Sequence, residues 1–213
     1  MDLKKIYEFL YKNFVGVDAL NPAIESIKHL DGRIYASDGH ILAKVECEYP
    51  ADREGKAFRK DGGLMNNSIR YESVIPASYT DDTHFTNRID DLRAAVKKVY
   101  RLEKGKDKAV IDFGIVEENA SGDPMLISFQ ASQLLIAFQL FDLLKEEFTI
   151  RVSSSSARCM MMLESLYSDS KVLIMPVWTP LDVEARTRPT FTVEEALNYK
   201  PEISTPNKAW YEL

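Results

Sequence analysis

The chain has 213 residues and a mass of 24.3 kDa, and its 27 lysines and arginines against 33 aspartates and glutamates give a net charge of −6. Hydrophobic residues make up 45% and charged residues 28%, which are ordinary globular proportions and exclude wholesale disorder. The length fits one large or two small domains. There is no apolar run of membrane-spanning length and no signal-peptide pattern at the start, so we expect a soluble, cytoplasmic protein.

Cysteine, histidine and glycine are too few, and wrongly spaced, for the common cofactor motifs. Cys47 and Cys159 lie far apart, and with three histidines they predict neither a disulfide scaffold nor a zinc site. The nine glycines include no phosphate-binding loop, which disfavours a nucleotide-dependent enzyme. We therefore expect reduced thiols, no metal and no cofactor.

The first third of the chain predicts one helix followed by a three-strand meander. Apolar residues recur at helical spacing over residues 3–14, and short strands are expected at 23–30, 33–37 and 40–47. Asp31-Gly32 and Asp38-Gly39 separate these strands and are strong hairpin signals. The polar stretch 48–67 is predicted as a connector with at most one short hairpin.

The rest of the chain repeats the pattern of a helix followed by short strands. Helices are expected at 87–102 and, capped by Ser132, at 133–144, where apolar side chains cover most of the circumference. Strands are expected at 109–113, 125–129, 148–152, 157–163 and 171–177. Residues 179–213 are rich in proline and predict an extended arm with a short helix at 193–199. The order of elements predicts an α+β fold of helices and antiparallel sheets.

Asp38 and His40 form one pair that has the chemistry of a catalytic site. A carboxylate beside an imidazole is a common acid–base pair, so a hydrolase built on these two residues is one hypothesis. The alternative is a hairpin turn, which Asp-Gly favours strongly. We prefer the turn and expect a protein that is not an enzyme.

A basic segment lies between Arg88 and Lys108. It holds eight basic and four acidic residues, a local charge of +4. On a helix, four of the basic residues share one face that suits a phosphate backbone: Arg93, Lys97, Arg101 and Lys104. An ordinary solvated helix surface is the alternative interpretation.

Four segments, in order along residues 3–178, resemble the bacterial sliding clamp, the β subunit of DNA polymerase III. The meander Asp31 to Ala43 resembles the family's "ATDGHRLA" hairpin, and Met65 to Pro76 resembles its "FPDYRRVLP" link. Phe129 to Leu135 is similar to its "FNxxYLL" helix entry, and Val172 to Trp178 to its closing "YVVMPMRL" strand. Ile41 stands where the family has arginine, and the tail after Trp178 has no counterpart in it.

The resemblance implies a DNA clamp fold of about one and a half clamp domains. Residues 1–76 would form a partial middle-type domain with a connector, 77–178 a complete last-type domain, and 179–213 a C-terminal extension. In the family, a groove between these two domains accepts a short peptide of polymerases and other replication proteins. The carried-over groove residues are Gly39, His40, Ile41, Leu42, Met175, Pro176 and Val177.

We therefore expect a clamp-like replication or repair accessory protein that tethers a partner through this groove. It would contact duplex DNA without sequence preference through Arg93, Lys97, Arg101 and Lys104, and it would form a homo-oligomer. The alternative is a clamp-fold peptide-binding module that no longer binds DNA. Gln139 to Leu144 superficially matches the peptide by which polymerases bind clamps, but its apolar surroundings favour a buried helix.

Overall fold

In the computed structural model the described residues are 2–17, 21–65, 70–71, 74–75, 82–84, 88–102, 109–119, 121–153 and 160–199. The predictions for Lys104, for Cys159 and for the end of the tail concern residues outside these ranges. The predicted α+β architecture is confirmed: helices pack on largely antiparallel sheets. Among the described helices, none is both long and apolar enough to cross a membrane.

The first third of the chain forms a helix and a meander, as predicted. Its elements are α1 (Leu3–Asn13), the 3-10 turn η1 (Pro22–Glu25), β1 (Ile27–Leu30), β2 (Arg33–Ser37), β3 (Ile41–Glu46), the 3-10 turn η2 (Ala51–Arg53), β4 (Ala57–Phe58) and β5 (Leu64–Met65). Asp2 begins α1 by accepting a hydrogen bond from the Lys5 backbone N–H, and Ile6, Leu10 and Phe14 are buried. The predicted hairpin between β1 and β2 has Asp31 and Gly32 at φ 51° and 70°, the left-handed pair that suits a tight turn.

The remainder of the chain builds the other half of the large sheet and a second, smaller sheet. Its elements are β6 (Asp82–His84), α2 (Ile89–Leu102), β7 (Val110–Glu118), β8 (Pro124–Gln130), α3 (Ala131–Leu144), β9 (Phe148–Ser153), β10 (Met161–Ser165), β11 (Lys171–Ile174), β12 (Val177–Pro180), β13 (Thr190–Thr192) and α4 (Val193–Asn198). Within α3, Leu140, Phe141 and Leu144 are buried, so the segment that resembles a clamp-binding peptide is core.

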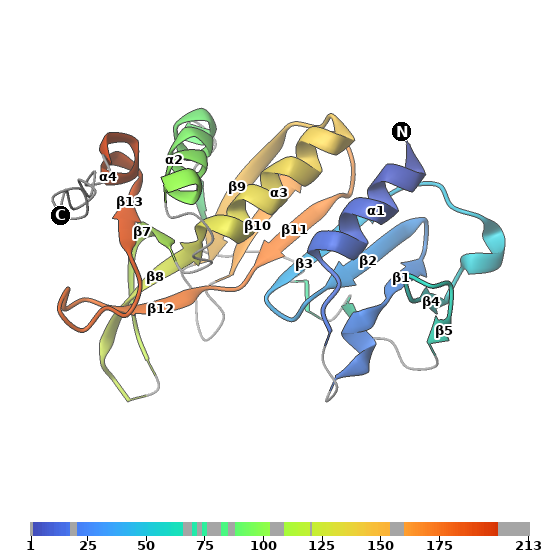
Figure 1. Cartoon of the computed structure of the whole chain (residues 1–213), viewed down its shortest axis with the longest axis horizontal. Coiled ribbons are helices and arrows are strands. Elements are labelled where there is room, and N and C mark those ends of the chain that lie inside the picture. The colour runs from blue at the N-terminus through green and yellow to red at the C-terminus, as the bar shows by residue number, and fades with distance from the viewer. Residues whose placement is uncertain are drawn as a thin grey trace, which may run out of the picture.

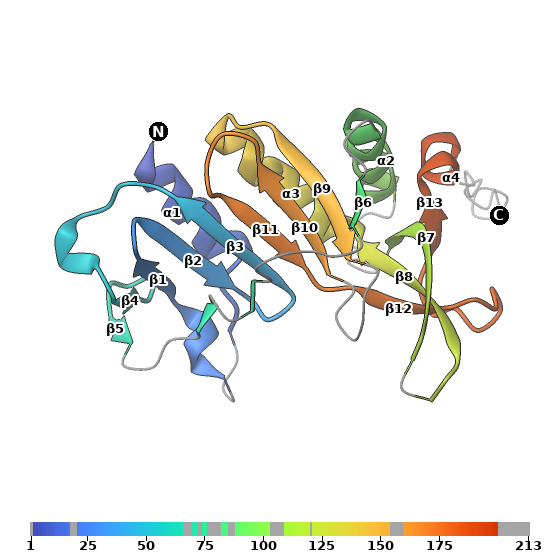
Figure 2. The ribbon, with the colours of Figure 1, turned by 180° about the vertical axis from the view of Figure 1, so that it is seen from behind.

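Two sheets lie end to end, with the helices along one side (Figure 1). The large sheet has the order β5-β4-β1-β2-β3-β11-β10-β9-β6, and the small one has the order β12-β8-β7-β13. Figure 2 shows the large sheet from behind, with α1 and α3 on its far face. α2 packs between α3 and α4 beside the small sheet. One apolar core includes buried residues of α1, α2, α3 and α4.

Three predicted boundaries were wrong. Residues 22–25 form the 3-10 turn η1 rather than the start of a strand, since Pro22 begins it. Ser132 does not cap α3: strand β8 runs directly into the helix at Ala131, whose N–H donates to the Ala109 carbonyl. The strand expected at 171–177 breaks at Met175-Pro176, where β11 ends and β12 crosses to the small sheet.

The predicted extension is part of the fold as far as residue 199. β13 pairs in parallel with β7, and α4 packs on α2. Thr192 and Glu195 form a capping box that starts the predicted short helix. The prediction treated 179–213 as an arm outside the repeats, whereas the structure uses its described part to complete the small sheet.

Candidate functional site: a groove where the two halves of the sheet meet

The turn that carries Gly39 and His40 is held rigidly by its own side chains. The Asp38 Oδ1 atom accepts hydrogen bonds from the backbone N–H groups of His40 and Ile41, both at 2.8 Å. Gly39 adopts φ 93°, a left-handed conformation that favours glycine. Ser37 Oγ donates to the Ile41 carbonyl at 2.9 Å and closes the turn. Asp38 thus builds the turn, as the hairpin interpretation predicts.

The second predicted wall lies beside this turn because β3 and β11 are neighbouring strands (Figure 2). Leu42 pairs with Leu173 and Ile41 with Ile174, although about 130 residues separate them in sequence. The Met175 N–H then donates to the His40 carbonyl at 2.8 Å. This pairing brings together the two segments that the clamp resemblance named.

A cavity of about 160 Å³ opens at this junction. Of the predicted groove residues, Gly39, His40, Ile41, Leu42 and Met175 line it, whereas Pro176 and Val177 do not because the chain turns away into β12. The sequence interpretation missed the other lining residues: Asn21, Ile24, Ser37, Tyr71, Val74, Met160 and Leu173. Tyr71, Val74 and Leu173 lie within the segments that carried the resemblance, so that signal was present.

The floor of the groove is a small apolar cluster, separate from the main core. Tyr35 and Tyr71 stack with ring centroids 5.7 Å apart, and Leu42, Met160 and Leu173 are buried with them. Met175 at the rim is 37% exposed, and His40 is exposed. An apolar floor with an adaptable methionine at the rim suits leucine and phenylalanine side chains of a peptide.

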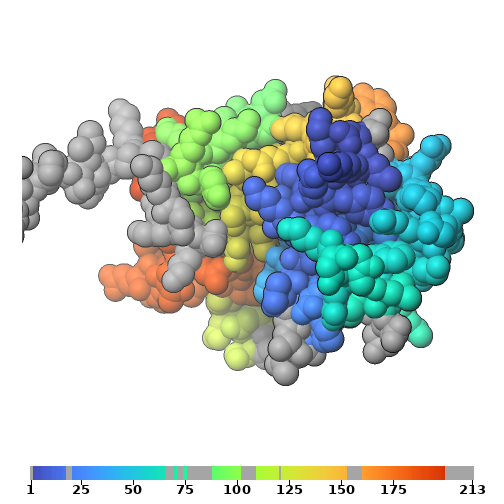
Figure 3. Space-filling view, turned by 45° about the vertical axis from the view of Figure 1, so that its right-hand side comes forward, coloured from blue at the N-terminus to red at the C-terminus, as the bar shows by residue number. Residues whose placement is uncertain are grey.

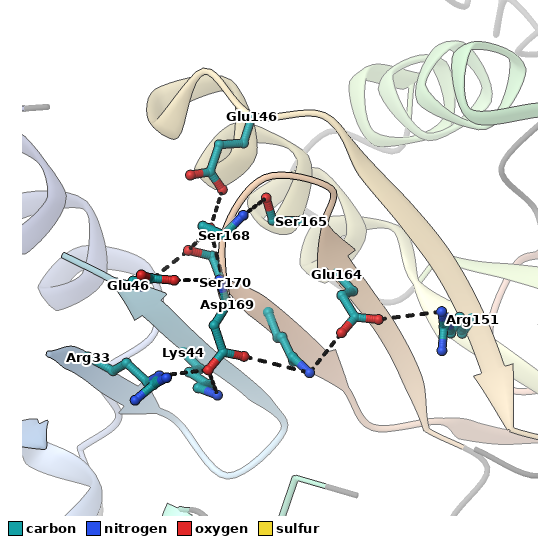
Figure 4. Close-up of polar contacts among 11 residues, drawn as sticks. Arg33, Lys44, Glu46, Glu146, Arg151, Glu164, Ser165, Ser168, Asp169 and Ser170 are labelled. Atoms are coloured by element: carbon teal, nitrogen blue, oxygen red, sulfur yellow. Dashed lines mark hydrogen bonds and ion pairs between the residues drawn. The ribbon is translucent and has the colours of Figure 1, made fainter. Parts of the chain in front are cut away.

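A network of ion pairs crosses the same junction (Figure 4). Asp169, in the turn between β10 and β11, accepts from Arg33 Nε at 2.7 Å and from Lys44 Nζ at 2.5 Å. Lys171, on β11, extends the network to β10: its Nζ atom lies 2.7 Å from the Glu164 carboxylate and 3.8 Å from that of Asp169. The network therefore ties β2 and β3 to β10 and β11 across the strand pair that forms the groove.

The charges around Asp169 favour its ionised form. Burial alone would raise its pKa, but the hydrogen bonds and charges of Lys44 and Arg33 outweigh burial and hold the pKa below its usual value. The Asp169 backbone N–H also donates to Glu46 at 2.6 Å. Contacts within the chain itself thus join β3 to the turn between β10 and β11.

Among the described residues, the structure gives Arg93 different surroundings from Lys97 and Arg101, the other two predicted phosphate ligands that it describes. Lys97 and Arg101 are exposed on α2. Arg93 instead faces α3, where its guanidinium pairs with Asp142 at 2.8 Å and lies over the rings of Phe138 and Phe148. Lys104 lies outside the described residues.

The described residues offer little for metal or thiol chemistry. Within the described ranges, no three His, Cys, Asp or Glu side chains gather closely enough to hold a metal ion. Cys47, directly after β3, is a buried free thiol, and burial raises its pKa to about 11, which keeps it protonated and unreactive.

Comparison with solved structures identifies the architecture. The sliding clamp (DNA polymerase III subunit beta) of Bartonella birtlesii, bound to griselimycin, superposes with a TM-score of 0.56 at 16% identity, over 82% of this chain and 64% of the clamp. The chain has the fold of a bacterial sliding clamp. The Helicobacter pylori beta clamp bound to a DNA ligase peptide has the same fold. It superposes with a TM-score of 0.53 at 11% identity, over 82% of this chain and 63% of the clamp. The Pseudomonas aeruginosa clamp with ligand agrees too, with a TM-score of 0.54 at 15% identity over 82% of this chain and 63% of the clamp.

The likeness is one of structure and is partial in length. This chain spans less than two thirds of each of these clamps, and no protein-family model or curated protein sequence matches it. The resemblance drawn from four short sequence segments is confirmed, because the same clamps emerge from the fold alone.

Proposed function

We propose that this clamp-fold protein is a non-enzymatic accessory factor of DNA replication or repair that binds a partner's short peptide in the β3–β11 groove. The observation that supports this most is the preformed apolar cavity at the junction, lined by Gly39, His40, Ile41, Leu42 and Met175. The H. pylori clamp, which shares the fold, was solved with a DNA ligase peptide. Pro176 and Val177 do not line this cavity, so they would contribute only by turning the chain from β11 into β12.

The peptide proposal is tested by fluorescence anisotropy with a labelled peptide that carries leucine and phenylalanine anchors. Met175→Lys places a charge at the groove rim and should weaken binding at least tenfold, the effect of about 1.4 kcal/mol. Trp178→Lys is the matched control, because Trp178 has the same 37% exposure but lies outside the cavity. Equal losses in both variants, or no binding by the parent chain, would refute the groove assignment.

DNA contact through α2 is the second part of the proposal. Lys97 and Arg101 are exposed residues of α2, where a phosphate backbone could reach them. This helix lies with the other helices along one side of the sheets (Figure 1). Two or three phosphate contacts give weak binding, and the logarithm of its affinity should fall with the logarithm of the salt concentration with a slope of about −2 to −3. Lys97→Glu with Arg101→Glu should abolish duplex binding at low salt, while the exchange Lys97→Arg with Arg101→Lys should preserve it.

The alternative is a clamp-fold module that binds a peptide but no DNA. The ion pair between Arg93 and Asp142 favours it, since that pair removes one of the four predicted phosphate ligands from the exposed face. Duplex binding that is absent at low salt in the parent chain, together with intact peptide binding, would select this alternative. The predicted homo-oligomer is tested in parallel by light scattering coupled to size exclusion, with and without duplex DNA.

A further inference from the structure

A second cavity lies at the opposite edge of the large sheet from α2, between α1 and the β4–β5 hairpin. Its volume is about 490 Å³. In Figure 3, α1 and the hairpin meet side by side on one face of the molecule. None of its lining residues belongs to the groove described above. The size is in the range of sites that hold a small ligand, about 300–1,000 Å³.

One wall of this cavity is aromatic and held in place. Tyr7 and Tyr11 lie one helical turn apart on α1 with ring centroids 6.4 Å apart, and Phe58 faces them from β4. The Tyr7 hydroxyl is hydrogen bonded to buried His29 at 2.5 Å, and the Tyr11 hydroxyl donates to the Phe58 carbonyl at 2.7 Å. Since both hydroxyls have internal partners, the two tyrosines offer ring surface to the cavity.

The rest of the lining is mostly cationic. Lys4, Arg53, Arg59 and Lys60 line the cavity, against the single acid Glu8. Glu8 and Lys4 are 4.0 Å apart and mostly exposed, which makes their attraction weak. The cavity therefore has an excess of positive charge around its aromatic wall.

Arg53 is the central cation of this site. Its guanidinium carbon lies 5.4 Å from the centre of the Tyr7 ring and 5.1 Å from that of Phe58, and it makes no ion pair with a carboxylate in the described part of the chain. Arg59, by contrast, is 3.6 Å from Glu25. A guanidinium that lies on aromatic rings and lacks an acidic partner remains available to an incoming anion.

We propose that this cavity binds a nucleotide unit, with the base against the Tyr11 ring and the phosphate on Lys60 and on Arg53, whose guanidinium already covers Tyr7 and Phe58. A flat ring joined to an anion fits both features of the lining, and base–aromatic stacking contributes about 1–3 kcal/mol per base. Duplex DNA keeps its bases stacked inside, so the unit comes from a single strand or from a free nucleotide. The site is separate from the groove and from α2, and the inference does not depend on the function proposed for either.

The test is fluorescence anisotropy of the full chain with a labelled single-stranded oligothymidylate at low salt. An abasic strand of equal length should bind at least tenfold more weakly, because it keeps the phosphates but lacks the stacking bases. Competition experiments with thymidine monophosphate and with an unlabelled strand distinguish a free nucleotide from a single strand as the ligand. The monophosphate should displace the labelled strand as well as the unlabelled strand does only if a free nucleotide is sufficient. Equal affinity for the abasic strand would reduce the interaction to charge alone and overturn the proposal.

Variants locate the binding on the molecule. Arg53→Gln with Lys60→Gln should weaken strand binding at least fivefold. Tyr11→Leu should weaken it equally but change the salt dependence of strand binding less, since tyrosine carries no charge. Lys56→Gln is the matched control, since Lys56 is exposed on the same segment but does not line the cavity. Binding that is lost in Lys97→Glu with Arg101→Glu but retained in Arg53→Gln with Lys60→Gln would place the strand on α2 and refute this site.

Discussion

The groove beside the β3–β11 junction and the exposed face of α2 are held in place by different forces. The groove depends on backbone pairing between strands far apart in sequence, on the buried cluster around Tyr71 and on the ion pairs of Asp169. The α2 face depends on exposed side chains of one helix, such as Lys97 and Arg101. Groove residues are thus part of what stabilises the fold, whereas the α2 charges are added to a helix that packs through its other side.

The two candidate sites should therefore differ in how mutation affects stability. A change in the groove floor alters the folded state itself, so binding and stability should fall together. A change on the α2 face should alter binding and leave stability almost untouched. Urea denaturation of variants from both sites measures this contrast.

Leu173→Ala should lower the free energy of unfolding by about 2–5 kcal/mol, the usual range when a buried leucine is truncated and leaves a cavity. Leu173 is 2% exposed, and it pairs with Leu42 at the centre of the groove. Urea denaturation measures the change. Leu181→Ala is the control, because Leu181 is 41% exposed and should cost less than about 0.5 kcal/mol. Similar values for both leucines would mean that the groove floor does not stabilise the junction.

Asp169→Asn should lower the free energy of unfolding by about 1–2 kcal/mol, between the values for exposed and for buried ion pairs. Without the carboxylate, Lys44 loses its partner although its side chain is only 13% exposed. Because the pKa of Asp169 is lowered in the fold, its contribution is present above the ordinary value of 3.8 and is lost as the pH falls below it.

Urea titrations at several pH values check both parts of this prediction. The gap between the parent chain and Asp169→Asn should be constant at neutral pH and should close in strong acid. Asp52→Asn serves as the control, since Asp52 is exposed and makes no ion pair within the described residues. A gap that persists at the lowest pH would show that the aspartate acts through something other than its charge.

His29 extends the contrast to the helix layer, because it ties α1 to the sheet. It is completely buried, and burial lowers its pKa below the ordinary value of 6.5. The unfolded chain therefore takes up the proton more readily, so stability is complete above pH 6.5 and falls as the pH drops below it. The slope cannot exceed about 1.4 kcal/mol per pH unit for one proton. His29→Gln should remove this slope in urea titrations, whereas the exposed-site variant His40→Gln should retain it.

Local sequence signals predicted the parts of the molecule that local forces build. Asp31-Gly32 and Asp38-Gly39 specify the meander because few residues adopt the left-handed conformations of these turns. The α1 helix follows from the spacing of Ile6, Leu10 and Phe14. The groove segments were identified by their resemblance to the clamp, and the pairing of β3 with β11 then brings them together.

Long-range packing accounts for what the sequence did not reveal. The resemblance to the clamp's closing strand assigns Val177 to the groove, whereas in the structure β11 ends before Pro176, which has no backbone N–H to donate, and β12 belongs to the other sheet. The pairing of β13 with β7 leaves no periodic signal in either segment. Helical spacing places Arg93 on one face with Lys97 and Arg101, which is why it was predicted to bind phosphate. Its ion-pair partner Asp142 lies 49 residues away in sequence, so local spacing could not reveal the pair.

The smallest effect is expected on the α2 face, where Lys97→Ala should change the free energy of unfolding by less than about 0.5 kcal/mol. The exposed side chain has no ion pair or hydrogen bond to lose among the described residues, and alanine is the better helix former. Arg93→Ala on the same helix should cost clearly more, since it removes both the pair with Asp142 and the contacts with Phe138 and Phe148. If urea denaturation of the two variants gave equal losses, Lys97 would be a structural residue, and the separation between a stabilising groove and a dispensable charged face would fail.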